Sequence, residues 1–425
     1  MRILAFNWRD ITHPKAGGAE QFIHEISKRL VAKGHSVTLY CGDYKGSENA
    51  PQMIDGVYMI RRGNEFTLYI HAVTDYLGKF FGKYDLIIDC NNGIPFFSPL
   101  FSGVPKILVV HHFMKEIFFK EVSFPHASLA YILERAIPLA YMGNKVIAVS
   151  ETTREEAISM GINPKNIRIV YNGVSSKLCP AFENKAKYPL IVSVGRLKKY
   201  KRLNMLVEAF GKMLEQLDNE MASKARLVIA GKGDAEDDIR NTIRELGLES
   251  KVIMKGYISE EEKCKLLQES WVFAAPSSKE GWGIAVIEAN ACGTPVVAFD
   301  VPGLRNSVRD GETGILVREE TSEALGKALA RLVVNKEERE RMARAAVSWG
   351  KRFDWDSCAQ DFMNVIDEVV GRKVPEKPVK VPVSADRTVI SAKPAVVYCL
   401  AHKAYDLDDD PGSVYKKETK ADALR

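Results

Sequence analysis

The sequence predicts an α/β protein built from two doubly wound domains that follow one another along the chain. Three observations carry this prediction: a length of 425 residues, the alternation of short apolar runs with amphipathic segments of helix length, and a polar, turn-rich stretch near the middle. A chain of this length is too long for one ordinary core. Short, nearly continuous apolar strands separated by helices are typical of parallel sheets covered on both faces.

The predicted strands form two sets. The first comprises residues 3–6, 37–41, 57–60, 86–90, 107–110, 146–149 and 167–171, and the second comprises residues 190–194, 227–230, 252–254, 272–275, 296–299 and 315–317. Helices are predicted between them from the helical spacing of apolar residues, as at Leu203, Leu206 and Val207. The capping-box spacing of Ser259 with Glu262 predicts the start of another helix.

The two sets predict a first domain at residues 1–178 and a second at residues 188–350, joined by the turn-rich stretch. The amphipathic pattern that follows predicts a final helix within residues 351–371. Prolines and charged residues then dominate, so residues 374–425 are expected to be a tail that is disordered or docks on a partner. The short apolar run at 395–400 is compatible with an edge strand.

Composition narrows the class of protein. Hydrophobic residues make up 46% of the chain and charged residues 27%, the balance of a soluble globular protein. The formal net charge of +5 is too small to predict nucleic-acid binding, which needs a concentrated basic face. The seven cysteines are scattered with no CxxC pair, so a disulfide framework or a zinc site is not expected, and a reducing compartment fits best.

Targeting signals are not apparent in the sequence. The apolar run at the N-terminus is too short for a signal peptide and is interpreted as the first strand. No apolar run approaches the roughly 18 residues that a spanning helix needs. A cytoplasmic protein is therefore expected, with peripheral contact to the cytoplasmic face of a membrane as an additional hypothesis.

Ligands of open parallel sheets bind beyond the carboxyl ends of the strands, and five segments of this chain lie there. Gly17 and Gly18 follow the first strand and precede a helix, where backbone N–H groups can approach a phosphate or a sugar oxygen. A plain tight turn is the alternative, and the absence of GxGxxG disfavours a dinucleotide. His111 and His112 follow another strand, where a histidine can bind a sugar hydroxyl, relay a proton or cap a loop.

Two further segments belong to the second domain. Arg196 and Lys201 bracket a strand-to-helix loop and are expected to converge on one crevice, where they offer a rigid fork and a point charge to phosphate oxygens. Solubilising surface charge is the alternative. Gly231 begins the glycine-rich segment GKGD at the next strand end, which an ordinary turn also explains.

The fifth segment, EGWGIAVIE, carries the most specific pattern. Glu280 lies in a glycine-rich loop after a strand, and Glu288 lies inside the next helix. Carboxylates are good acceptors for vicinal hydroxyls such as those of a ribose. The glycines expose backbone N–H groups to a ligand.

Taken in order, GGAE, VGRLKKYK, GKGD, EGWGIAVIEA and ACGTPVVAF resemble the retaining glycosyltransferases of family four in the sequence classification. The resemblance covers residues 1–371 and implies the GT-B fold, in which two Rossmann-like domains face a central cleft. It places the acceptor at the first domain and the nucleotide-sugar donor at the second. It also implies that the helix within residues 351–371 crosses back to pack on the first domain.

The resemblance also implies roles for individual residues. Arg196 and Lys201 match the basic pair that binds the donor diphosphate, Glu280 lies beside the donor sugar, and Glu288 binds the ribose. His111 matches a histidine near the sugar, although His112 leaves that alignment ambiguous by one position. The donor-binding set is completed by Gly17, Gly18, Gly231, Gly281, Trp282, Gly283 and Ile284.

The implied reaction moves a hexose-type sugar from a nucleoside-diphosphate sugar to an acceptor hydroxyl, with retention of configuration. Electrostatic stabilisation of the leaving diphosphate by Arg196, Lys201 and helix N-termini would make a metal or another cofactor unnecessary. The Asp-x-Asp candidates at Asp354 and at residues 408–410 are interpreted as a helix cap and as part of the tail.

The expected acceptor is a glycan or a lipid-linked molecule. An aromatic and basic stretch beside the histidine pair suggests an apolar, partly cationic surface that contacts a membrane; ordinary core packing is the alternative. It comprises Phe96, Phe97, Phe101, Phe113, Lys115, Ile117, Phe118, Phe119, Lys120 and Phe124. Rival functions are a GT-B hydrolase, epimerase or synthase acting on the same donor, or a non-catalytic GT-B subunit that binds a partner.

Overall fold

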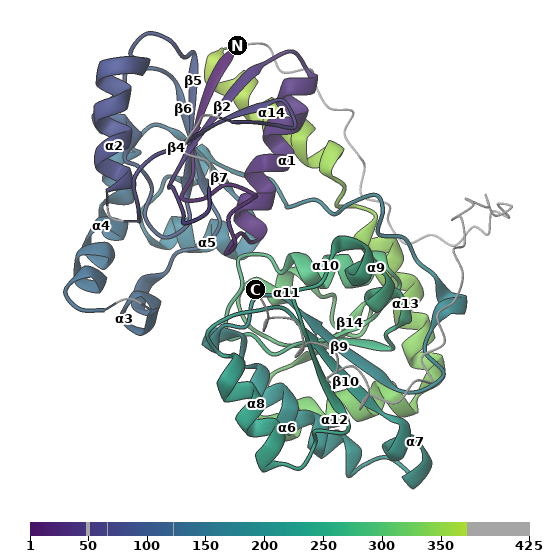
Figure 1. Ribbon diagram of the computed structural model, residues 1–425. Helices are drawn as coiled ribbons and strands as arrows, with labels where there is room; N and C mark the ends of the chain where they lie inside the picture. The colour runs from purple at the N-terminus through teal and green to yellow at the C-terminus, as the bar shows by residue number, and fades with distance from the viewer. Residues whose placement is uncertain (48–51, 66, 122, 372–425) are drawn as a thin grey trace, which may run out of the picture. The chain divides into compact units, whose positions relative to one another are not determined.

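The computed structural model describes residues 1–47, 52–65, 67–121 and 123–371 (Figure 1). The described residues belong to one continuous structural unit. The predicted tail at residues 374–425, its apolar run at 395–400 and the aspartates at 408–410 lie outside the described ranges. The described chain forms two parallel-sheet α/β domains, as the alternation of strands and helices predicts.

Within the described residues, the first sheet has eight strands in the order β3-β4-β2-β1-β5-β6-β7-β8. Neighbouring strands are parallel except β3 and β4, which are antiparallel. The strands are β1 (Arg2–Phe6), β2 (Ser36–Cys41), β3 (Gln52–Ile54), β4 (Val57–Arg61), β5 (Leu86–Asn91), β6 (Lys106–Val110), β7 (Lys145–Ala148) and β8 (Ile167–Ile169).

The second sheet has six described strands in the order β11-β10-β9-β12-β13-β14, and every neighbouring pair is parallel. The strands are β9 (Leu190–Val194), β10 (Arg226–Ala230), β11 (Val252–Gly256), β12 (Val272–Ala275), β13 (Val296–Phe299) and β14 (Gly314–Val317). In both sheets the strand order reverses beside the first strand of the domain, which is where ligands of such folds bind.

Helices alternate with the strands. The described α-helices are α1 (Gly18–Ala32), α2 (Leu68–Asp75), α3 (Phe118–Glu121), α4 (His126–Ala140), α5 (Glu151–Ser159), α6 (Leu203–Leu214), α7 (Asn219–Lys224), α8 (Glu236–Glu245), α9 (Glu260–Glu269), α10 (Ile284–Ala291), α11 (Leu304–Ser307), α12 (Ser322–Val334), α13 (Lys336–Gly350) and α14 (Trp355–Val370).

Every predicted strand is present, with bounds that differ by no more than two residues from those expected. Strands buried on both faces are apolar along their whole length, which makes them visible in the sequence. The short edge strand β3 was not predicted, because its side chains are exposed or half-buried and carry no such signal.

The last described helix, α14, returns to the first domain. Its Trp355, Phe362 and Ile366 belong to the same apolar core as Ile3 and Phe22. Figure 1 shows α14 beside α1, in agreement with the contacts between these helices. α14 therefore completes the apolar core that includes β1.

The helix start at α14 also accounts for an Asp-x-Asp pattern. Asp354 is its N-cap and accepts a hydrogen bond from the backbone N–H of Ser357 at 2.8 Å. The next carboxylate of the pattern, Asp356, lies 2.7 Å from Arg29 Nε. Both side chains thus have structural partners, as the capping interpretation predicts.

Candidate functional site

The glycine pair after β1 lies against residues of the second domain. A Cβ atom added at Gly17 would lie 3.4 Å from Arg196 Nε, and one added at Gly18 would lie 2.6 Å from Ile284 Cδ1. The backbone N–H of Gly17 donates to Glu20 Oε2 at 2.7 Å, which starts α1 with a capping interaction. The chain before α1 therefore lies close to the side chains of Arg196 in the β9–α6 loop and of Ile284 at the start of α10.

The two basic residues of the β9–α6 loop have different partners. Lys201 forms an ion pair with Glu280, and Ser277 Oγ donates to the same carboxylate oxygen at 2.7 Å. Among the described residues, the guanidinium of Arg196 forms no ion pair within 4 Å. Its charge nevertheless acts on the buried carboxyl of Glu20: burial raises the pKa of that group, and the Arg196 cation opposes this shift. Arg196 is therefore the cation of this pair that forms no ion pair, and it lies beside Gly17 at the start of α1, where a phosphate would meet the guanidinium and the N–H groups of the first helical turn.

The histidine pair after β6 is split between the protein interior and the site. His111 is 5% exposed, and its ring meets the ring of Phe22 edge-on with 5.3 Å between centroids. Burial lowers the pKa of His111 to about 3. Its Nε2 has no hydrogen-bond partner among the described residues. The His111 side chain is therefore buried and packs against α1.

His112 is half-buried and lies among the charges of the site. Burial lowers its pKa to about 4; the cations of Lys279 and Arg196 lower it further, whereas Glu280 opposes them. A neutral imidazole at this place can accept or donate a hydrogen bond near pH 7. Of the two histidines, His112 is the one that the electrostatic contacts connect to Glu280 and Arg196.

The EGWG segment between β12 and α10 is shaped by contacts with the first domain. A Cβ atom at Gly281 would lie 2.2 Å from the carbonyl oxygen of His111. The carbonyl oxygen of Gly281 accepts a hydrogen bond from Ser150 Oγ at 2.7 Å and a longer one from Thr153 Oγ1 at 3.4 Å. Glycine is required at this position because the two backbones nearly touch.

Two neighbours of Gly281 complete the turn into α10. The ring of Trp282 is 3% exposed and packs on Tyr171 and Phe353, with centroid distances of 4.6 and 5.0 Å. Gly283 has a φ of +86° and is the N-cap of α10. The Trp282 side chain therefore supports the fold.

Glu288, inside α10, is held by a residue that sequence reasoning missed. Lys263 of α9 lies 2.8 Å from Glu288 Oε1, and both side chains are buried. Burial raises the pKa of Glu288, and the Lys263 ammonium opposes this shift. A signal was available, because Lys263 occupies the buried stripe of α9 together with Leu266 and Leu267, where a lysine needs a partner.

The glycine-rich segment after β10 has a packing role. A Cβ atom at Gly231 would lie 1.8 Å from the carbonyl oxygen of Gly195, and one at Gly233 would lie 2.1 Å from that of Leu197. The turn therefore supports the loop that carries Arg196. This close approach accounts for both glycines without a ligand.

A cavity of about 210 Å³ lies at the carboxyl ends of β1, β2 and β4 in the first domain. The guanidinium of Arg9 stacks 3.9 Å from the ring centroid of Trp8. Within the described ranges, neither Arg9 nor Lys15 forms an ion pair. The carboxylates of Asp43 and Glu65 also line the cavity. The lining residues are Trp8, Arg9, His13, Lys15, Gly42, Asp43, Asn64 and Glu65.

The predicted aromatic surface is only partly exposed. Phe96, Phe113 and Phe118 are buried, so their assignment to a surface was wrong; they belong to three separate apolar clusters of the first domain. Phe119 and Phe124 are exposed, as expected. The neighbouring α4 adds exposed apolar residues that were not predicted, namely Leu129, Ile132, Leu139 and, just after the helix, Met142. No helix in the described ranges has the length and apolar character to span a bilayer.

Two family models match the chain. The model described as "Glycosyltransferase Family 4" matches residues 16–178, and the model described as "Glycosyl transferases group 1" matches residues 177–349. A D-inositol 3-phosphate glycosyltransferase of Corynebacterium aurimucosum is 29% identical over 247 residues, which are 54% of this chain and 58% of that protein. The chain spans less than two thirds of the length of the curated relatives that it matches first.

Solved structures show the same fold. Sucrose-phosphate synthase from Thermosynechococcus elongatus is 21% identical, with a TM-score of 0.72 over 87% of this chain and 99% of that one. The Anabaena protein HepE, solved in complex with UDP-glucose, is 20% identical, with a TM-score of 0.67 over 87% of this chain and 100% of that one.

Proposed function

Because the chain belongs to the group 1 glycosyltransferases of family 4 and has the GT-B fold, we propose that it is a retaining hexosyltransferase. It moves the sugar of a nucleoside-diphosphate sugar to an acceptor hydroxyl. One observation carries the proposal: Arg196, which forms no ion pair among the described residues, lies beside Gly17 at the start of α1, in the same site as the Lys201–Glu280 pair. HepE, a protein of the same fold, was solved with UDP-glucose, which supports a donor of this class.

The diphosphate would be held by positive groups of the protein. Arg196 supplies a guanidinium, and the N-termini of α1 and α10 supply backbone N–H groups and the positive ends of their dipoles. These groups stabilise the charge that develops on the leaving diphosphate. We therefore propose that transfer proceeds without a divalent metal.

The sugar and the ribose would lie against the two glutamates of the EGWGIAVIE segment. Glu280, oriented by Lys201 and Ser277, faces the sugar, and Glu288, oriented by Lys263, accepts hydrogen bonds from the ribose. The neutral His112, rather than His111, is the proposed histidine beside the sugar, since its charged neighbours belong to the site. The packing of His111 against Phe22 leaves it a structural role.

The acceptor would enter through the cavity of the first domain. Arg9 and Lys15 favour an acceptor that carries a phosphate or a carboxylate, while Asp43 and Glu65 suit its hydroxyl groups. A relative is named for a phosphorylated acceptor, D-inositol 3-phosphate, which supports this chemistry. A phosphate-linked lipid carries the same anionic group. The exposed apolar residues of α4 and the α3–α4 segment would then meet the surface of an anionic membrane.

Calorimetric titration with UDP, GDP and ADP and their sugar conjugates, with EDTA present, tests the donor site. Tight binding of one nucleoside diphosphate without metal would identify the base. Its sugar conjugate would then be incubated with phosphorylated and unphosphorylated sugars and inositols. Transfer to the phosphorylated acceptors supports the proposal; release of free sugar at the same rate with and without acceptor would instead indicate a hydrolase. No binding in folded protein would indicate a non-catalytic subunit.

A further inference from the structure

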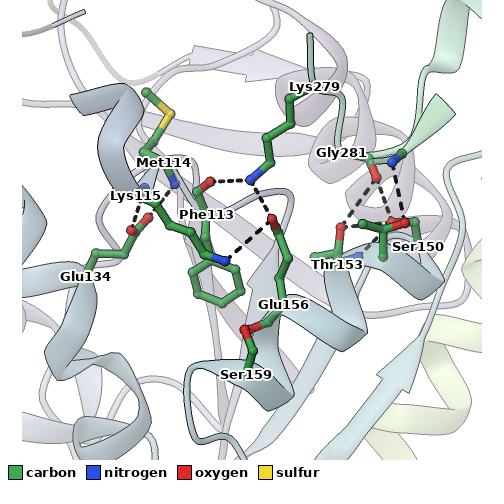
Figure 2. Close-up of polar contacts among 12 residues, drawn as sticks. Phe113, Met114, Lys115, Glu134, Ser150, Thr153, Glu156, Ser159, Lys279 and Gly281 are labelled. Carbon is green, nitrogen blue, oxygen red and sulfur yellow. Dashed lines mark hydrogen bonds and ion pairs between the residues drawn. The ribbon is translucent and has the colours of Figure 1, made fainter. Parts of the chain in front are cut away.

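A lysine next to Glu280 joins the donor loop to the first domain. Lys279 belongs to the segment between β12 and α10, residues 276–283, which we call the donor loop. The Nζ atom of Lys279 donates to the carbonyl oxygen of Phe113 at 2.9 Å and lies 2.6 Å from Glu156 Oε1 (Figure 2). Phe113 directly follows the histidine pair, so the donor loop is connected to the segment that carries His112.

The partner carboxylate is shared by two cations. Lys115 Nζ lies 3.7 Å from the same oxygen of Glu156, as Figure 2 shows. The side chains of Lys279 and Glu156 are only 17% and 15% exposed, so their ion pair is less screened than one on the surface. Glu156 therefore connects three segments: α5, the chain after His112, and the donor loop.

The same face of α5 holds the donor loop at a second point. Ser150, Thr153 and Glu156 are spaced three residues apart, which places their side chains on one side of the start of the helix. Ser150 and Thr153 donate to the carbonyl oxygen of Gly281, and Glu156 binds Lys279 (Figure 2). The residues before and after Glu280 are thus both anchored on α5, while the Glu280 side chain forms its ion pair with Lys201.

We propose that Lys279 and Glu156 are a positioning pair that sets the location of Glu280 relative to His112. Neither side chain contacts the donor or the acceptor in this proposal; the pair acts through the backbone of the donor loop. The inference rests on the proposed transferase function for its kinetic consequence. The anchoring of the loop can be measured without activity.

The consequence is a separation of binding from chemistry. The nucleotide is held by Arg196 and Glu288, whose contacts do not involve Lys279. Loss of the pair should leave nucleotide affinity within about twofold, while a misplaced Glu280 lowers the rate of transfer by about tenfold or more, because small displacements of positioned groups are costly in catalysis.

The test compares Lys279→Met, Glu156→Gln and the double variant with the native chain. Lys145→Met is the matched control, because Lys145 forms a similarly buried ion pair with Glu368, 3.0 Å away, that joins β7 to α14. Nucleoside-diphosphate affinity is measured by calorimetry, kcat by product formation, and loop anchoring by hydrogen–deuterium exchange of peptides spanning residues 111–116 and 276–283.

We expect lower kcat in both single variants, no further loss in the double variant, near-native nucleotide affinity and faster exchange in both peptides. Lys279→Arg should recover part of the rate, and the control should match the native chain. Native kcat in Lys279→Met, strictly additive losses, or slower transfer with unchanged exchange would overturn the inference. If the native chain transfers no sugar but the exchange changes are present, the proposed function fails while the anchoring role stands.

Discussion

Lys263 Nζ lies 2.8 Å from Glu288 Oε1, and their side chains are 11% and 6% exposed. This contact joins α9 to α10 and gives the carboxylate proposed for the ribose a fixed, ionised partner. Burial favours the protonated acid and raises the pKa of Glu288, and the Lys263 ammonium opposes this shift.

Lys263→Met tests this relationship. The variant leaves a buried carboxylate without its cation, and we expect the free energy of unfolding to fall by about 3–5 kcal/mol. Urea denaturation at pH 7 measures the loss. Lys265→Met, which removes an exposed lysine of the same helix, is the control and should change stability little. A loss no larger than that of the control would contradict the buried ion pair.

Arg196→Gln should weaken nucleotide binding without weakening the fold. The guanidinium has no ion pair to lose within the described residues, so the unfolding temperature should stay unchanged. Loss of its charged hydrogen bonds to a diphosphate should raise Kd by about 10- to 150-fold, as calorimetry can measure. Lys198→Ala, which removes a nearby lysine paired with Asp234, should retain near-native affinity. Equal affinities of the native chain and Arg196→Gln would remove Arg196 from the phosphate site.

Gly281→Ala should disturb the junction between the donor loop and the first domain. The added Cβ would lie 2.2 Å from the carbonyl oxygen of His111, a backbone atom that cannot turn away. We expect transfer to fall at least tenfold, because Glu280 moves with this loop. Gly103→Ala has no atom within 4 Å of the new Cβ and serves as the control. Native activity in Gly281→Ala would show that the loop relaxes without consequence.

The buried histidine His111 makes stability depend on pH. Folding lowers its pKa from the ordinary value of about 6.5 to about 3, so the unfolded chain binds a proton below pH 6.5 that the folded chain does not. The free energy of unfolding should therefore decrease as pH falls from about 6.5 towards 3, by up to about 1.4 kcal/mol per pH unit from this residue. Urea denaturation at several pH values should show a shallower decrease in His111→Asn. An identical slope would contradict the burial of a neutral ring.

The exposed side of α4 should govern vesicle binding. Ile132 and Leu139 are 63% and 74% exposed and lie seven residues apart, on one side of the helix. Replacing both with Glu should abolish sedimentation with vesicles that contain phosphatidylglycerol, while soluble acceptors are still glycosylated. Replacing the exposed Ile253 of the second domain with Glu is the control. Unchanged sedimentation of the double variant would exclude this face from membrane contact.

The two sheets and the positions of the motifs could be predicted from the amino-acid sequence. Buried strands such as β6 and β9 are continuous apolar runs, and their carboxyl ends are visible because polar or glycine residues follow at once. Gly281 and Gly231 could also be identified, since glycines in loops that follow strands mark close approaches of the backbone. The family resemblance adds the roles that we propose for Arg196 and Glu288.

Which side chains contact one another could not be predicted, because these contacts depend on the folded chain. His111 packs on Phe22, whereas His112 lies near Glu280. The pattern of apolar residues does not predict this difference, because both histidines follow the same strand and only the directions of their side chains differ. Lys279 and Glu156 are 123 residues apart, and Lys263 and Glu288 lie on different helices. Such pairs depend on how loops from distant parts of the chain approach one another. Local sequence patterns indicate whether a residue is buried or exposed. Which residue it contacts depends on how the whole fold packs.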